Sequence, residues 1–118
     1  MPAINGARLL EDLQHLRQFG AVGNGVVRPA LSAIDIESRT RLSERMQAAG
    51  LSPLIDGVGK VFGRSTRPGP ALIIGSHTDT QPQGGWLDGA MGVMYGLEVA
   101  RAFAESKDCA DLAIDVAS

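Results

Sequence analysis

The chain has 118 residues, of which 44% are hydrophobic and 20% charged, so its composition is that of one globular domain rather than a disordered segment. Eleven basic against thirteen acidic residues leave a net charge of −2, which gives no electrostatic footprint for nucleic acid or an anionic membrane, and no stretch has the roughly 18 apolar residues of a membrane helix. The N-terminus lacks the apolar core of a signal peptide and Cys109 is the only cysteine, so we expect a cytoplasmic protein without intrachain disulfides.

The first half of the chain predicts two helices. Apolar residues at helical spacing run through residues 4–19, where Asn5 is a candidate N-cap. Ser32 and Asp35 have the spacing of a capping box, which predicts the start of a second helix. An apolar helical face follows, and Gly50 is a natural end for it.

The second half predicts strands around one long helix. Residues 51–55 and 60–64 are expected to pair around a tight turn. Residues 71–75 form a continuous apolar run, which is typical of a strand buried on both faces. A glycine-containing helix that can approach a sheet closely is expected over 88–105, and a last strand over 113–117. This order of elements predicts an α/β or α+β layer fold.

Polar residues begin directly after the apolar run, at the carboxyl end of a strand, where open α/β sheets place their ligands. His77 and Asp79 are two residues apart, so in an extended backbone their side chains point the same way, and Asp79 can accept the free ring N–H of His77. Asp88 stands at the start of the expected helix. One imidazole and one carboxylate suit a divalent transition metal, zinc first and manganese or cobalt next.

A second interpretation stays open, because a catalytic zinc usually has three protein ligands and the sequence indicates two. In that interpretation His77 is a hydrogen-bonded loop histidine and Asp88 is a helix N-cap. The only other histidine, His15, lies within the apolar pattern of the first helix, where we expect a packing or surface role. No P-loop or G-x-S-x-G elbow is present.

The stretch from Gly75 to Val93 carries the pattern S-H-x-D-x-Q-P-x-G-G followed by D-G-x-x-G-V. This pattern resembles the first metal-ligand segment of metal-dependent amidohydrolases, namely N-carbamoyl-L-amino-acid hydrolases, beta-ureidopropionases and allantoate amidohydrolases, within the zinc aminopeptidase–aminoacylase superfamily. The resemblance extends upstream through residues 28–32, the capped helix that ends at Gly50-Leu51, and residues 56–64, although Gly59-Lys60 stands where the family often has Gly-Asn. It covers essentially the whole chain.

The resemblance implies an α/β fold, specifically a partial three-layer α/β/α catalytic domain with a mixed sheet. Residues 1–118 would be its N-terminal portion, without the family's lid and dimerisation domain. In the family, the segment matching residues 111–118 is followed by a glutamate pair, which supplies the general base and a metal ligand, and by two further histidine ligands. We therefore expect a chain that stops before the catalytic domain is complete.

The resemblance also implies a role for each polar residue. His77 would bind one metal ion, Asp88 would bridge two, and Asp79 would orient His77, while the peptide bond between Asp88 and Gly89 would be cis. In the intact family site, two zinc, manganese or cobalt ions would polarise the carbonyl of a small N-carbamoyl or ureido substrate. A later glutamate would move the proton of the attacking water.

The 118 residues alone are expected to be inactive, because the general base and most ligands are absent. The alternative function is therefore an inactive remnant that acts as an association module. The last expected strand would leave Ile114 and Val116 without covering elements. Exposed apolar patches and strand edges favour self-association.

Overall fold

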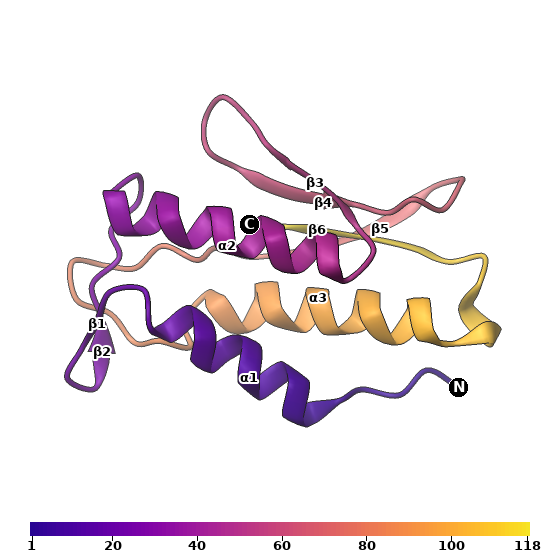
Figure 1. The fold of residues 1–118 in the computed structure, drawn as a ribbon, viewed down its shortest axis with the longest axis horizontal. Coiled ribbons are helices and arrows are strands. Elements are labelled where there is room, and N and C mark those ends of the chain that lie inside the picture. The colour runs from indigo at the N-terminus through magenta and orange to yellow at the C-terminus, as the bar shows by residue number, and fades with distance from the viewer.

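The computed structural model describes residues 1–118 and contains three α-helices and two sheets (Figure 1). The helices are α1 (Gly6–Arg17), α2 (Ala33–Ala48) and α3 (Ala90–Glu105), and a short 3-10 turn, η1 (Lys107–Cys109), follows α3. The larger sheet contains β3 (Ser52–Ile55), β4 (Val61–Arg64), β5 (Ala71–Gly75) and β6 (Ala113–Ala117). The smaller sheet is the unexpected two-residue pair β1 (Ala21–Val22) and β2 (Gly25–Val26). None of the helices combines the length and the apolar character needed to cross a bilayer.

The predicted helix starts are confirmed. The side chain of Asn5 accepts the N–H of Arg8 at 3.0 Å, and the hydroxyl of Ser32 accepts the N–H of Asp35 at 3.3 Å. The carboxylate of Asp35 accepts the N–H of Leu31 at 2.8 Å, one residue before the cap. The second half of the capping box is thus displaced by one position along the chain.

The four strands of the larger sheet lie in the order β3-β4-β6-β5. The pairs β3–β4 and β4–β6 are antiparallel, whereas β5 and β6 are parallel and are joined through α3. This confirms the expected α/β class and the mixed sheet. The topology places the connection between β5 and α3 at the carboxyl end of the parallel pair, where ligands bind in open α/β sheets.

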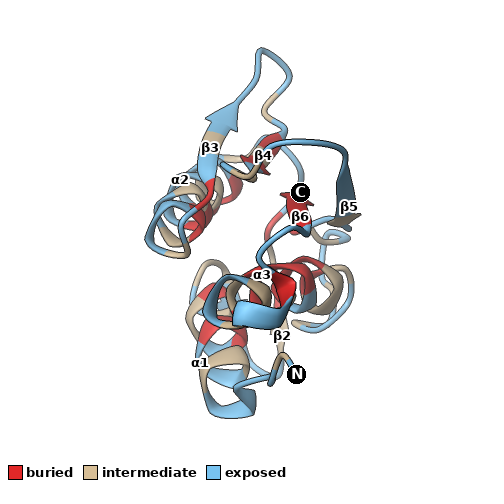
Figure 2. Cartoon of the chain, turned by 90° about the vertical axis from the view of Figure 1, so that its right-hand side faces the viewer, coloured by how far each residue is buried: buried red, intermediate tan, exposed pale blue.

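All three helices lie on one side of this sheet, so these residues form two of the three expected layers. Helix α2 covers β3 and β4, α3 covers β5 and β6, and α1 packs on α3 (Figure 2). A single core joins the two layers, and its buried residues include Leu42, Met46, Val61, Val93, Leu97, Ile114 and Val116. The opposite face of the sheet carries no helix.

Two expectations about strand burial are wrong, because β6 rather than β5 occupies the inner position of the sheet. Strand β6 lies between β4 and β5, under α3, so Ile114 and Val116 are buried rather than uncovered. Strand β5 is consequently an edge strand rather than one buried on both faces. Its residues Leu72 and Ile73 are 62% and 59% exposed.

The glycines of α3 allow the helix to lie against the end of β5, as the sequence predicts. A Cβ atom added at Gly96 would lie 3.0 Å from Cγ2 of Ile74, and one added at Gly92 would lie 2.7 Å from Cβ of Ser76. Side chains at these two positions would push the helix away from the strand. The distance between α3 and β5 therefore depends on glycine.

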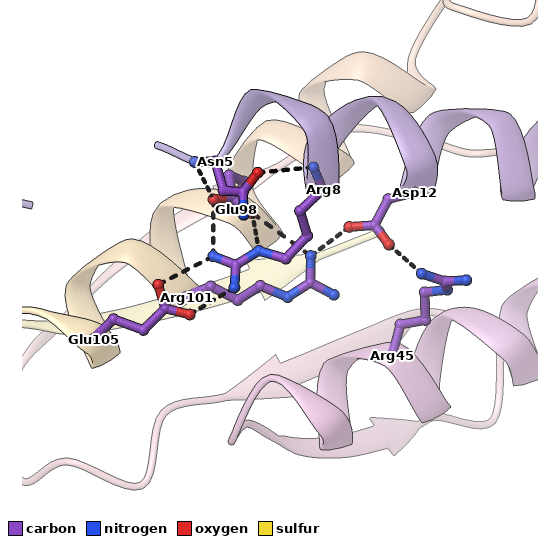
Figure 3. A network of polar contacts seen from close by, with 7 residues as sticks. All are labelled: Asn5, Arg8, Asp12, Arg45, Glu98, Arg101 and Glu105. Atoms are coloured by element: carbon purple, nitrogen blue, oxygen red, sulfur yellow. Dashed lines mark hydrogen bonds and ion pairs between the residues drawn. The ribbon is translucent and has the colours of Figure 1, made fainter. Parts of the chain in front are cut away.

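Charged residues connect the three helices inside the helical layer (Figure 3). Asp12 of α1 is completely buried, and its carboxylate accepts hydrogen bonds from Arg45 of α2 and Arg101 of α3. One carboxylate thus links all three helices. Because it is removed from water, its charge needs both partners.

Glu98 of α3 is the second buried carboxylate of this network. It accepts hydrogen bonds from the guanidinium Nε–H of Arg8 and from the backbone N–H of Asn5, both at 2.8 Å (Figure 3). Burial raises the pKa of Glu98, but the hydrogen bonds from Arg8 and Asn5 and the charge of Arg101 outweigh it, so the pKa lies below its ordinary value. Glu98 therefore stays ionised and fixes the start of α1 against α3.

We expect Asp12→Asn to lower the free energy of unfolding by about 2–3 kcal/mol, because it leaves two arginines without the carboxylate between them. Urea unfolding followed by circular dichroism measures this loss. The matched control is Glu44→Gln, which breaks the half-exposed ion pair with Arg41 and should cost less than about 1 kcal/mol. Equal losses in the two variants would contradict a special role for the buried carboxylate.

Candidate functional site

The site is built on the segment that leaves β5 and returns to α3. The ring Nδ1 of His77 lies 3.0 Å from the backbone oxygen of Asp79 and 3.4 Å from its Oδ1. A carbonyl oxygen can only accept a hydrogen bond, so Nδ1 carries the proton in this contact. The lone pair of Nε2 is then free to bind a metal ion. Asp79 therefore contacts the ring more closely through its backbone oxygen than through its carboxylate.

Asp88 lies on the Nε2 side of the ring. Its Oδ2 is 3.8 Å from Nε2 of His77, and the two side chains are 80% and 50% exposed, respectively. Helix α3 begins at the N-cap Gly89 without any side-chain cap hydrogen bond. The alternative interpretation of Asp88 as a helix cap is therefore wrong, and its carboxylate is free for another partner.

Gly89 turns the chain between Asp88 and α3. Its φ and ψ are +72° and −49°, and the carbonyl of Asp88 accepts the N–H of Ala90 at 2.8 Å, which is the pattern of a γ-turn. A Cβ atom at Gly89 would lie 2.4 Å from Cε1 and 2.5 Å from the carbonyl oxygen of His77. All peptide bonds are trans, so the expectation of a cis bond before Gly89 is wrong. The positive φ of Gly89 makes the reversal instead.

The His77–Asp88 pair opens into a shallow cleft of about 350 Å³. Its lining residues are Ala30, His77, Asp79, Thr80, Gln81, Pro82 and Asp88. Nitrogen and oxygen ligands of one tetrahedral zinc ion stand about 3.3 Å apart, so the separation of 3.8 Å suits two neighbouring ligand positions after a small adjustment. No cluster of three or more histidine, cysteine, aspartate or glutamate side chains is arranged to hold a metal. The donor set therefore fits part of a metal centre.

The other histidine lies away from this cleft. His15 of α1 packs edge-to-face on Phe19, with ring centroids 5.5 Å apart. Its burial lowers the pKa of the imidazole, which favours the neutral form. The expected packing role of His15 is confirmed.

Residues near β2 support the site loop, and the sequence analysis did not single them out for this role. Val26 and Gly84 exchange backbone hydrogen bonds of 2.8 and 2.9 Å. Next to them, Arg28 donates its backbone N–H to Oγ1 of Thr80 and accepts the N–H of Thr80, both at 2.8 Å. In the sequence, Arg28 follows two valines and precedes a proline. This pattern by itself does not show whether the arginine side chain is buried or exposed.

A family model and curated relatives both relate this chain to hydrolases. Residues 58–117 match the family described as Peptidase family M28. An N-carbamoyl-L-amino-acid amidohydrolase of Pseudomonas sp. (strain NS671) is 38% identical over 86% of this chain and 26% of its own length. An allantoate amidohydrolase of Bacillus subtilis (strain 168) is 32% identical over 80% of this chain and 24% of its own length.

A solved structure resembles the whole chain closely. It is an amidase of the hydantoinase/carbamoylase family from Burkholderia phymatum, with 62% sequence identity and a TM-score of 0.98. The match covers 100% of this chain and 29% of the amidase. The chain thus spans about a quarter of the length of the curated relatives it matches.

We expect Gly89→Ala to lower the free energy of unfolding by about 2–4 kcal/mol, because the new methyl group meets the ring and carbonyl of His77 at a positive φ. Gly85→Ala is the matched control, since nothing lies within 4 Å of its added Cβ and its φ is not positive. The control should change stability by no more than about 0.5 kcal/mol in the same urea titration. A tolerated alanine at position 89 would contradict the tight turn.

Proposed function

This chain belongs to peptidase family M28, and from that premise we propose that it supplies part of the metal centre of an amidohydrolase. The observation that carries the proposal is the pair of His77 Nε2 and Asp88 Oδ2, 3.8 Å apart, with the opposite ring nitrogen bonded to Asp79. His77 and Asp88 are the metal ligands in this proposal, and Asp79 is the positioning residue. Zinc, manganese and cobalt suit one imidazole and one carboxylate.

A divalent ion held there would polarise the carbonyl of the substrate and make a bound water more acidic. The residues of this chain bind and orient. Asp79 would keep the proton of His77 on Nδ1, and the carboxylate of Asp88 would hold the metal beside Nε2 of His77. The exposed cleft beside them admits a small molecule from solvent.

The substrate class is a small N-carbamoyl amino acid or ureido compound, whose C–N bond is hydrolysed. This assignment is supported by the Pseudomonas and Bacillus subtilis amidohydrolases and by the Burkholderia phymatum amidase. In the proposal, residues 1–118 correspond to the N-terminal portion of the catalytic domain of these relatives, and they act in the cytoplasm. Two ligands do not complete a catalytic site, so these residues alone bind metal weakly and do not turn over substrate.

Titration with Co²⁺, followed by its visible absorption, tests the ligand pair. We expect His77→Ala and Asp88→Asn each to weaken cobalt binding by at least about tenfold, since even changes to residues behind the ligands have that effect. The matched control is His15→Gln, which removes the other histidine and should leave the cobalt affinity unchanged. An equal loss in the control would mean that cobalt binds elsewhere.

The same preparations, loaded with Zn²⁺ or Mn²⁺, are then assayed for release of amino acid from N-carbamoyl amino acids. We expect no turnover by the 118 residues. Turnover that His77→Ala abolishes would contradict the proposal that the chain holds only part of the site.

A second function, self-association, is favoured by one observation. The outer edge of β5 has no neighbouring strand, and Leu72 and Ile73 are exposed on it. Unpaired backbone groups beside apolar side chains are a template for pairing with another chain. In this proposal two copies of the chain associate through β5.

Sedimentation velocity at increasing concentration tests this second function. We expect the chain to form dimers or larger species, and Ile73→Lys to shift it toward monomer, because an edge lysine opposes strand pairing. Leu10→Lys is the control, since Leu10 is similarly exposed but lies on α1. A monomer at all concentrations would contradict association through β5.

A further inference from the structure

Arg28 is a buried cation that the proposed chemistry does not use. Its side chain is only 1% exposed, which is unusual for arginine. The guanidinium contacts no carboxylate and donates only to backbone oxygens. Its Nε donates to the carbonyl of Thr78 at 2.7 Å, and its Nη1 donates to the carbonyls of Leu16 and Phe19 at 3.0 and 2.6 Å.

These contacts join two parts of the chain that are far apart in sequence. Leu16 and Phe19 lie at the carboxyl end of α1. The last carbonyls of a helix have no partner within it, and together with the helix dipole they favour a positive charge. Thr78 lies between His77 and Asp79. The planar guanidinium therefore spans from the end of α1 to the centre of the metal-binding segment.

The backbone of Arg28 holds the other side of the same segment. Its N–H donates a hydrogen bond to the side chain of Thr80, and its C=O accepts one from the backbone N–H of Thr80. Arg28 is therefore hydrogen-bonded to the residues on both sides of Asp79. The carbonyl of Asp79 is the group that accepts Nδ1–H of His77. Displacement of this segment would move that carbonyl and rotate the imidazole away from Asp88.

The charge of Arg28 is also placed toward the site. Burial lowers the pKa of the guanidinium, and the carboxylates of Asp35 and Asp79 act in the opposite direction. The guanidinium still remains protonated, because arginine is not deprotonated in proteins. A permanent positive charge thus lies close enough to the Asp79 carboxylate to interact with it.

We propose that Arg28 is a positioning residue of the metal site, whose guanidinium fork holds the Thr78–Thr80 backbone so that His77 presents Nε2 toward Asp88. This inference deepens the proposed function and rests on it for the role of the metal. A lysine does not replace the fork, because its single nitrogen cannot reach both Thr78 and the end of α1.

The first readout needs no metal. In the structure, Gly89 lies against Cε1 of His77, so a nuclear Overhauser contact between Hα of Gly89 and Hε1 of His77 reports the ring position. We expect this contact in the unaltered chain, its loss in Arg28→Ala and Arg28→Lys, and its return in Arg28→Ala on addition of millimolar methylguanidinium. Arg28→Lys retains the charge and most of the aliphatic stem, so it tests the fork even where the alanine variant does not fold.

The matched control is Arg101→Met, which removes an arginine whose side chain is 11% exposed and which lies about 18 Å along α3 from Gly89. It should lower the unfolding temperature but keep the Gly89–His77 contact. Persistence of the contact in both Arg28 variants, or its loss in Arg101→Met as well, would overturn the positioning role.

The second readout is the affinity for Co²⁺, which we expect to fall at least about tenfold in Arg28→Lys and to be unchanged in Arg101→Met. An unchanged affinity in Arg28→Lys would overturn the role of Arg28 at the metal site. Failure of the unaltered chain to bind cobalt would instead overturn the proposed ligand pair, while the Gly89–His77 contact would still decide whether Arg28 positions the ring.

Discussion

The close contact between α3 and the end of β5 is the constraint on which the candidate site depends. His77 follows β5 and Asp88 precedes α3, so the spacing of these two elements sets the spacing of the two side chains. Gly92 and Gly96 let the helix approach the strand. Gly89 then reverses the chain directly beside the imidazole, in a space where any side chain would meet the ring.

Helix α1 has two functions in this arrangement. The buried carboxylates of Asp12 and Glu98 hold it to α2 and α3 (Figure 3). The contribution of such buried charges to stability depends more on the geometry of their hydrogen bonds than on their number. The last carbonyls of α1 also receive the guanidinium of Arg28, which continues to Thr78. A helix that does not line the cleft is thereby connected to the candidate site segment through one side chain.

The exposure of His77 and Asp88 in the cleft agrees with the proposal that the chain contributes two ligands rather than a complete site. Asp88 is largely in water and His77 is half-exposed, so both are solvated before any ion arrives. In the proposed site, a metal ion would have to replace water on both side chains, and the exposed surroundings would strengthen its attraction to Asp88 little. The relatives are more than three times as long as this chain, and their names are those of amidohydrolases. Family M28 membership supports hydrolase chemistry in general, and the substrate class rests on these relatives.

Local features could be read directly from the sequence. The caps at Asn5 and Ser32 and the H-x-D spacing of the site depend on residues no more than three positions apart. Their geometry is set by the backbone of one helix turn or one extended segment, so neighbouring residues suffice to predict it.

Strand order, by contrast, was decided only by the tertiary structure. The apolar run of β5 indicates a strand, but whether that strand is central or at an edge depends on where β6 inserts. The role of Arg28 likewise depends on the meeting of α1, β2 and the site loop. Sequence pattern indicated the three helices and the four strands of the larger sheet, and it singled out the candidate site residues. Only the folded chain decided which segments meet, because burial and long-range hydrogen bonds are properties of pairs of segments and not of either one alone.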